Sequence, residues 1–312
     1  MFIISMIGAR RSARFFSLPA ALFFAFFLLL SCVSPPASAA APGEKPERSM
    51  TLKVMSINIR HNSDFWEERF PLIADEIVRL EPDLIGLQEV EIGIDQSAKL
   101  LELVSEKSGA DLEYRVYERL KTGGSFISGE GIAIFSRFPI AASDFADLEH
   151  GRPVLLARIR LAKGLAVDIY NTHLHHRGGD DVRLPQARKI AAFMKKRNAG
   201  LITFLTGDMN ARPDSPNIEF IRSLGFVDTF RAAYPDTEAV TGNTSPVIMS
   251  KNKFPQNFVQ RIDYVFMKPA EGETDTPGIE VVDSVVCFKS PRGDGLYPSD
   301  HLGVMTTFEI VY

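Results

Sequence analysis

The feature of this sequence that most constrains its fold is the repeated alternation of short apolar runs with segments of helical periodicity. Residues 52–59 alternate between apolar and polar side chains and predict a strand, whereas residues 70–80 carry apolar side chains at helical spacing and stop before Pro82. By the same criteria we expect strands near 83–89, 113–118, 131–136, 153–160, 165–172, 201–206, 261–267, 279–288 and 304–311, and helices near 97–107, 182–197 and 217–224. Such a mixture indicates two packed sheets flanked by helices or one doubly wound sheet, and periodicity alone does not separate the two.

The N-terminal segment has the pattern of an export signal. Three arginines within residues 10–14 precede an apolar run over residues 18–30, which is typical of a signal peptide. Cleavage after the Ala-Ser-Ala motif at 37–39 would release a secreted or periplasmic protein. Alternatively, the segment ending at Cys32 resembles a bacterial lipobox, in which a lipidated Cys32 would attach the protein to a membrane, and an uncleaved anchor is a third possibility.

The remainder of the chain has the composition of an ordinary soluble globular protein. We therefore expect a signal peptide over residues 1–41, a linker over 42–50 and one domain over 51–312, which is a monomer. Residues 1–41 contain three arginines and no acidic residue, so their removal changes the formal net charge from −4 to −7. An acidic chain disfavours a general nuclease, because nonspecific binding to nucleic acid usually depends on a basic face. Cys287 is the one cysteine outside the signal segment, and its apolar neighbours predict a small buried side chain.

Polar side chains gather at the ends of the predicted strands. Taken singly, each is explained as a turn former, a cap or a surface charge, but together they suggest one preorganised cleft. In the segment 207–210, an extended backbone would turn Asp208 and Asn210 to the same side. The chain has no nucleophile turn of the G-x-S-x-G kind, which argues against a serine hydrolase. The side chains of this set are Asn58, Glu89, His173, Asp208, Asn210, Asp263, Asp300 and His301.

Seven short segments carry these residues in a fixed order, and together they resemble the endonuclease/exonuclease/phosphatase superfamily. That superfamily includes pancreatic-type deoxyribonuclease, abasic-site endonucleases, neutral sphingomyelinases and inositol polyphosphate 5-phosphatases. The resemblance covers residues 50–312 and implies an α/β fold, a four-layer sandwich of two packed mixed β-sheets flanked by helices. The segments are 56–59, 87–90, 131–137, 171–174, 207–210, 261–264 and 299–301.

The resemblance implies a metal site. Glu89 would be the principal ligand of Mg²⁺ or Mn²⁺, hard cations that prefer carboxylate oxygen, and Asn58 and Asp300 would support the site directly or through water. Arg60 stands where abasic-site endonucleases carry an acidic ligand, which disfavours that subgroup.

The resemblance also implies roles in catalysis. Asp263 would hold the imidazole of His301 in its tautomer and orientation, while His173 and Asn210 would donate hydrogen bonds to phosphate oxygens. Asp208 would orient or deprotonate the attacking water, and the sequence leaves open whether Asp208 or His301 is the base.

Residues beyond His173 are candidates for substrate binding. His175, His176 and Arg177 could bind a second phosphate or an anionic head group, or form a solvated loop before the next helix. Arg183 and Gln186 lie early on that helix, where the family commonly has an Arg and a Gln, and one of them is expected to brace the site.

These residues predict a metal-dependent hydrolase that cleaves phosphodiesters or phosphomonoesters outside the cytoplasm by in-line attack of water. Lipid head groups, sugar phosphates and nucleic acid remain open as substrates. The alternatives are a secreted nuclease of the same fold and an inactive binding module on this scaffold. Loops over residues 119–130 and 235–258 are expected to set specificity.

Overall fold

The computed structural model describes residues 48–121, 129–235, 242–245, 257–272 and 276–312. The predicted signal peptide and all but the last three residues of the linker lie outside these ranges, as do most of the two predicted specificity loops. Export, cleavage and lipidation of Cys32 therefore stay predictions. No helix in the described ranges combines the length and apolarity needed to cross a bilayer.

Two six-stranded sheets form the centre of the fold. The first sheet contains, in spatial order, β11 (Gly278–Cys287), β12 (Gly303–Val311), β1 (Ser49–Asn58), β2 (Leu84–Glu91), β4 (Glu130–Ser136) and β3 (Arg115–Leu120). The second contains β5 (Ile140–Asp147), β6 (Pro153–Ala162), β7 (Leu165–His173), β8 (Ile202–Asp208), β10 (Asp263–Lys268) and β9 (Val227–Asp228). Both sheets are mixed, because β1 runs parallel to β2, and β7 runs parallel to β8, while their other neighbours are antiparallel.

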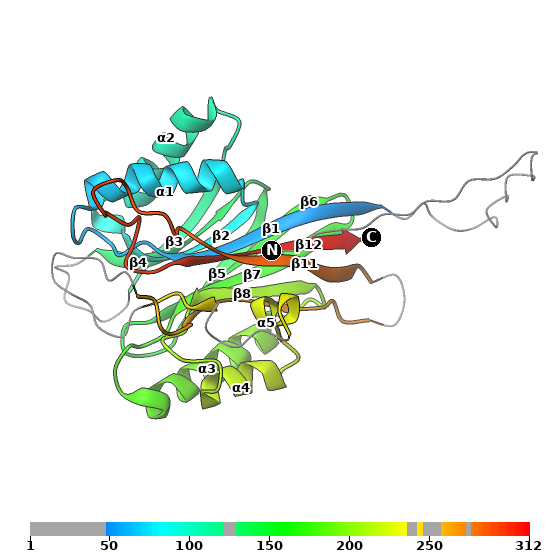
Figure 1. Ribbon diagram of the computed structural model, residues 1–312. Helices are drawn as coiled ribbons and strands as arrows, with labels where there is room; N and C mark the ends of the chain where they lie inside the picture. Colours follow the sequence, from blue (N-terminus) through cyan, green and yellow to red (C-terminus); the bar gives the residue numbers. More distant parts are fainter. Residues whose placement is uncertain (1–47, 122–128, 236–241, 246–256, 273–275) are drawn as a thin grey trace, which may run out of the picture. The chain divides into compact units, whose positions relative to one another are not determined.

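Helices cover the outer faces of the two sheets (Figure 1). The helices are α1 (Trp66–Leu80), α2 (Gln96–Ser108), α3 (Gly179–Arg197), α4 (Pro216–Ser223) and α5 (Thr229–Ala233), with a short 3₁₀ turn at Ile92–Ile94. One apolar cluster lies between the sheets, a second lies under α1 and α2, and a third lies under α3 and α4. Cys287 is buried in the second cluster, as expected. The four-layer sandwich is therefore confirmed, and the doubly wound alternative is wrong.

The sequence misplaced a few elements for identifiable reasons. It missed β5, whose residues do not alternate cleanly between buried and exposed, and it missed the very short β9 and α5. It also started α1 and α3 three to four residues late, since their first turns are largely polar and lack an apolar stripe. Hydrophobic periodicity detects an element only where one of its faces packs against a core.

The topology brings many chain segments to one edge of the sandwich. The parallel strands β1, β2, β7 and β8 all end there, and the antiparallel strands β4, β6, β10 and β12 begin there. A hydrogen bond from Asn58 at the end of β1 to Asp208 at the end of β8 joins the two sheets at this edge. The predicted site residues therefore meet at a single place.

Candidate active site

Glu89 occupies a strained position in β2. Its φ is 53°, in the left-handed region that a residue with a side chain seldom adopts, and the pairing of β2 with β4 shifts register at this residue. The bulge directs the carboxylate toward Asn58, whose Nδ2 donates to Oε1 at 3.1 Å. The carbonyl of Glu89 also accepts from the backbone N–H of His61 at 2.7 Å. Strain of this kind is commonly retained where a side chain must be aimed at a functional site.

Asp208 is the centre of a buried polar cluster. Its Oδ2 accepts from Nδ2 of Asn58 at 3.2 Å, and its Oδ1 accepts from the backbone N–H of Asn210 at 2.9 Å. Nε2 of His173 lies 3.4 Å from Oδ2, and Nε2 of His301 lies 3.9 Å from the same oxygen. One carboxylate thus faces both imidazoles that the sequence singled out.

His301 and Asp263 form the predicted pair. Nδ1 of His301 donates to Oδ2 of Asp263 at 2.9 Å, and Asp263 is fully buried. Asp263 stands opposite Asp208 in the pairing of β10 with β8, so two carboxylates approach the same imidazole. With Nδ1 bound to Asp263, the imidazole turns Nε2 toward Asp208, in the arrangement of an acid/base dyad.

Burial and neighbouring charge set the protonation of the cluster. Burial, followed by the charge of Asp263, raises the pKa of Asp208 to about 7. Burial alone would lower the pKa of His301, but the charges of Asp263, Asp208 and Asp300 raise it well above the usual value. Burial, followed by the positive charge of Arg152, lowers the pKa of His173 well below the usual value. At neutral pH we therefore expect an imidazolium at His301 and a neutral imidazole at His173.

A second group of side chains suits a divalent cation. Glu89, Glu130 and His173 each offer a ligand atom, and these atoms lie within 4.8 Å of one another. Nδ1 of His173 is buried and has no hydrogen-bond partner in the described ranges, which fits an imidazole whose partner is a ligand. The two carboxylates of this group are the oxygen donors that a hard divalent cation prefers. The sequence missed Glu130, although it lies immediately before the segment 131–137 that carried the resemblance.

Asp300 is held by protein groups. Its Oδ2 accepts from Nη1 of Arg60, and its Oδ1 accepts from the hydroxyl of Ser299 at 3.2 Å. Arg60 also binds Asp64, so the residue that departs from the abasic-site pattern is the ion-pair partner of Asp300. Support of the metal site by Asp300 stays a prediction, and these contacts favour its indirect form.

The stretch 207–210 is not extended throughout. Asn210 has a φ of 47°, because its backbone N–H turns back to the carboxylate of Asp208. Its Nδ2 donates to the carbonyl of Leu174 at 3.0 Å. Asn210 thus lies beside Asp208 through a tight turn and not through strand alternation, and its role toward phosphate stays a prediction.

The predicted substrate-binding residues lie on the loop between β7 and α3, next to His173. The rings of His175 and His176 stack with centroids 5.2 Å apart, and His150 contacts His175 at the same distance. Arg177 is exposed at the end of this row.

Two residues of α3 hold this loop in place. Oε1 of Gln186 accepts from the N–H of His175 at 3.0 Å, and Nη1 of Arg183 contacts the carbonyl of His175 at 3.5 Å. Arg183 also pairs with Asp180 on the same helix at 3.4 Å, and its role toward the site or the substrate stays a prediction.

Arg69 is a buried residue that sequence reasoning missed. It is wholly inaccessible, and burial lowers its pKa only to about 10, so it stays charged at neutral pH. Its guanidinium joins the loop after β1 to the loop that precedes His301. It donates to the carbonyls of Ile59, Arg60, His61, Ser63, Asp64 and Pro298. The sequence signal that could have indicated its burial is its position directly before the apolar residues of a predicted helix.

The family comparison agrees with this geometry. A model described as the Endonuclease/Exonuclease/phosphatase family matches residues 55–301, which is most of the chain. The chain belongs to this family of phosphoesterases.

Relatives divide among several substrates. An inositol phosphosphingolipids phospholipase C of Schizosaccharomyces pombe is 27% identical over 311 residues, covering 85% of this chain and 70% of that protein. A sphingomyelinase of Mycobacterium bovis is 25% identical, covering 50% of this chain and 30% of that protein. Nocturnin of Drosophila melanogaster is 24% identical, covering 91% of this chain and 50% of that protein.

Solved structures show the same fold. A mannosyl-6-phosphatase of Bacteroides thetaiotaomicron superimposes with a TM-score of 0.63 at 24% identity, covering 84% of this chain and 100% of that chain. TDP2 of D. rerio, solved with a single-strand DNA product, has a TM-score of 0.65 at 20% identity, covering 83% and 98% of the two chains. At these identities the likeness shows the fold alone.

Proposed function

We propose that this protein is a Mg²⁺- or Mn²⁺-dependent phosphodiesterase that cleaves the head group from phospho- or sphingolipids outside the cytoplasm. The observation that carries the hydrolytic part is the meeting of Asn58, Glu89, Asp208 and His301 at one edge of the sandwich. The phospholipase C and sphingomyelinase relatives support a lipid diester, and the signal-like residues 10–30 support export.

Glu89 and Glu130 are the residues that would hold the cation, and His173 lies next to them. When bound, the cation neutralises negative charge on the phosphoryl and leaving oxygens. Glu89 lies in a bulge whose backbone is held by a hydrogen bond from His61, so its carboxylate would need little rearrangement to bind the cation.

Asp208 is the proposed base. A carboxyl whose pKa is raised to about 7 accepts a proton efficiently at neutral pH, and Asn58 and Asn210 fix its two oxygens. The water oxygen forms a bond to phosphorus while its proton passes to Asp208, and the bond from phosphorus to the leaving alcohol oxygen breaks. The alcohol oxygen then takes up a proton from solvent.

The two imidazoles stabilise the charge that develops on the phosphoryl oxygens. His301 acts as a cation oriented by Asp263, and His173 acts as a neutral donor in a buried position. This assigns the base to Asp208 and a donor role to the His301–Asp263 pair.

The test is hydrolysis by the purified chain of bis-p-nitrophenyl phosphate, p-nitrophenyl phosphate and vesicles containing sphingomyelin or phosphoinositol sphingolipid. Each is assayed with Mg²⁺, Mn²⁺, Ca²⁺ or EDTA, and plasmid DNA is included to test the nuclease alternative. We expect the diester to be cleaved faster than the monoester, lipid faster than DNA, and EDTA to abolish both. Full activity in EDTA would contradict metal dependence, and activity confined to monoesters would make the protein a phosphatase.

Export is tested separately, by expressing the full chain and fractionating the cells. We expect the protein outside the cytoplasm, and palmitate labelling of wild type but not of Cys32→Ala would identify the lipoprotein form. Retention of the wild type in the cytoplasm would contradict the localisation.

A further inference from the structure

A buried cation beside the candidate site lacks a carboxylate partner in the described ranges. Arg152 is 5% exposed, and its Nη2 donates to Nδ1 of His176 at 3.2 Å. Its Nη1 is buried and has no hydrogen-bond partner among the residues that the structure describes. A buried charged N–H without an acceptor is strongly unfavourable, so this atom points to an acceptor that binds there.

The topology separates Arg152 from Asp208 by two strand positions. Arg152 immediately precedes β6, and the order of strands in the second sheet is β6, β7, β8. Adjacent strands lie about 4.8 Å apart, so the backbone at the start of β6 lies roughly 10 Å from the end of β8, which carries the proposed base Asp208. His173 ends the intervening strand β7 and lies between the two.

The surroundings leave the charge of Arg152 available for a ligand. The charges of Glu130, Asp208 and Glu89 all act on Arg152, but among the described residues none of them forms an ion pair with it, and Glu130 is bound to Lys121. His176 accepts from Arg152 through Nδ1, so its neutral ring carries the proton on Nε2 and can donate a second hydrogen bond. Among the described residues, no carboxylate contacts the row of imidazoles that continues from His176 through His175.

We propose that Arg152 and His176 form a subsite for a second phosphate group, carried by the substrate next to the scissile phosphodiester. A guanidinium binds phosphate oxygens through two parallel N–H groups, and Nη1 and Nη2 of Arg152 present this fork next to an imidazole donor. This inference rests on the proposed function, because the subsite is defined relative to the phosphodiester that the protein would cleave. It narrows the substrate class to phosphodiesters that carry an additional phosphomonoester on the head group.

The first test compares two diesters that differ only in a second anionic group, ethyl p-nitrophenyl phosphate and 2-phosphonoethyl p-nitrophenyl phosphate. The phosphonate resists hydrolysis, so release of p-nitrophenolate reports the same bond in both. We expect wild type to have a kcat/KM at least about tenfold higher for the phosphonate, through KM, as charge-assisted hydrogen bonds allow. Arg152→Gln should bring this ratio close to one, and Arg152→Lys should keep part of it.

Arg160→Gln is the matched control, because Arg160 is exposed at the opposite end of β6 and should leave the ratio unchanged. A ratio of one in the wild type, or an unchanged ratio in Arg152→Gln, overturns the subsite. If Arg152→Gln lowers kcat/KM equally for both substrates, the ratio is also unchanged, and Arg152 would then contact the scissile phosphate itself.

A binding measurement keeps the inference testable if neither diester is hydrolysed, an outcome that would contradict the proposed function. Calorimetry in Mg²⁺ buffer compares ethane-1,2-diphosphonate with ethylphosphonate. We expect the diphosphonate to bind at least about tenfold more tightly to wild type, to lose this advantage in Arg152→Gln and to keep part of it in Arg152→Lys. Equal affinities in the wild type, or an advantage that persists in Arg152→Gln, would refute the subsite.

Discussion

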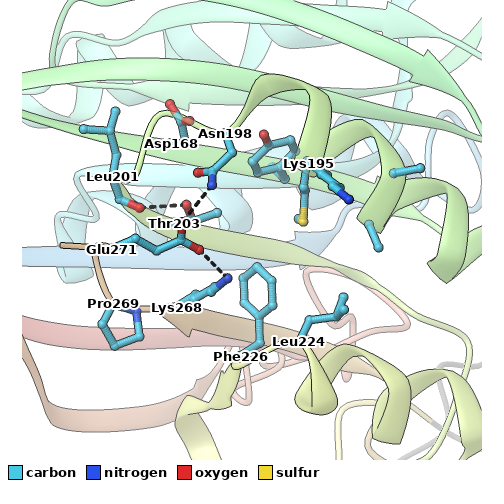
Figure 2. Close-up of a pocket in the computed structure, with 14 residues that line it drawn as sticks. Asp168, Lys195, Asn198, Leu201, Thr203, Leu224, Phe226, Lys268, Pro269 and Glu271 are labelled. Carbon is cyan, nitrogen blue, oxygen red and sulfur yellow. Dashed lines mark hydrogen bonds and ion pairs between the residues drawn. The ribbon is translucent and has the colours of Figure 1, made fainter.

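The two ends of strands β7 and β8 differ in their chemistry. At the amino ends, a pocket of about 350 Å³ is bordered by Asp168, Thr203, Phe226 and Glu271 (Figure 2). At the carboxyl ends, His173 and Asp208 face each other across a cluster of buried acids and imidazoles.

The difference lies in how the polar groups are satisfied. At the pocket, Asp168 accepts two hydrogen bonds from Arg158 at 2.8 Å. Glu271 binds Lys268 at 2.8 Å (Figure 2). At the carboxyl ends, the pKa of Asp208 is raised and a buried nitrogen of His173 lacks a partner in the described ranges. A hollow alone therefore does not mark a catalytic site, whereas convergent polar groups with shifted pKa values do.

The largest expected loss of activity comes from substitutions at the carboxyl ends of the strands. Asp208→Ala, Glu89→Ala and His301→Ala should each lower kcat by at least about 100-fold. They remove, respectively, the proton acceptor, a cation ligand and a cationic hydrogen-bond donor. Steady-state kinetics on bis-p-nitrophenyl phosphate, with circular dichroism to confirm folding, measures this. Asp168→Asn is the matched control, a buried aspartate at the opposite strand end, and its kcat should stay within about twofold. A folded His301→Ala protein with full activity would refute the assignment.

A smaller effect is expected from the residue that joins the loops of the catalytic end. Arg69→Ala should lower kcat by roughly 10- to 100-fold, because the loops that carry Arg60 and His301 lose their shared donor. Guanidinium ions added to the folded variant should restore part of the activity, whereas a merely unfolded protein would not respond. Arg79→Ala, an exposed arginine on the same helix, is the control. Unchanged kcat in Arg69→Ala would show that the loops are held by other contacts.

The pH dependence of activity should distinguish the roles of the two titrating groups. Asp208 acts as the carboxylate, so kcat should rise with pH, roughly tenfold per unit, until its pKa of about 7 is passed. His301 acts as the cation, so activity should fall again only at alkaline pH, where its raised pKa is crossed. A kcat profile in saturating Mg²⁺ measures both limbs. A profile that falls as pH rises from 6 to 7 would contradict the assignment of Asp208 as base.

The smallest effects are expected at the pocket. Asp168→Asn should cost about 1–3 kcal/mol of the free energy of unfolding, because it leaves the guanidinium of Arg158 without its buried partner. Lys268→Gln, in a half-exposed pair, should cost less than about 1 kcal/mol. Urea denaturation measures both. A loss of kcat in Lys268→Gln would mean that the two ends of the strands are coupled.

Much of the site was readable before the fold was known. The polar residues that end apolar strands, from Asn58 to His301, were each found from the pattern of the chain, and the structure gathers them. Glu130, Arg69 and Arg152 were not found. The periodicity around each of these residues indicates only a strand end or a helix. It does not indicate which distant residues the side chain contacts in the folded protein.

The sequence by itself determined the strand and helix pattern, the family and the set of acids and imidazoles available for phosphoester chemistry. Only the tertiary structure decided how these acidic and imidazole side chains are oriented. The positive φ of Glu89 and of Asn210 depends on a bulge in β2 and on a turn closed by Asp208, and the charge of Asp300 is bound to Arg60. These features depend on contacts between residues far apart in the chain, and side-chain periodicity records only which local face is buried.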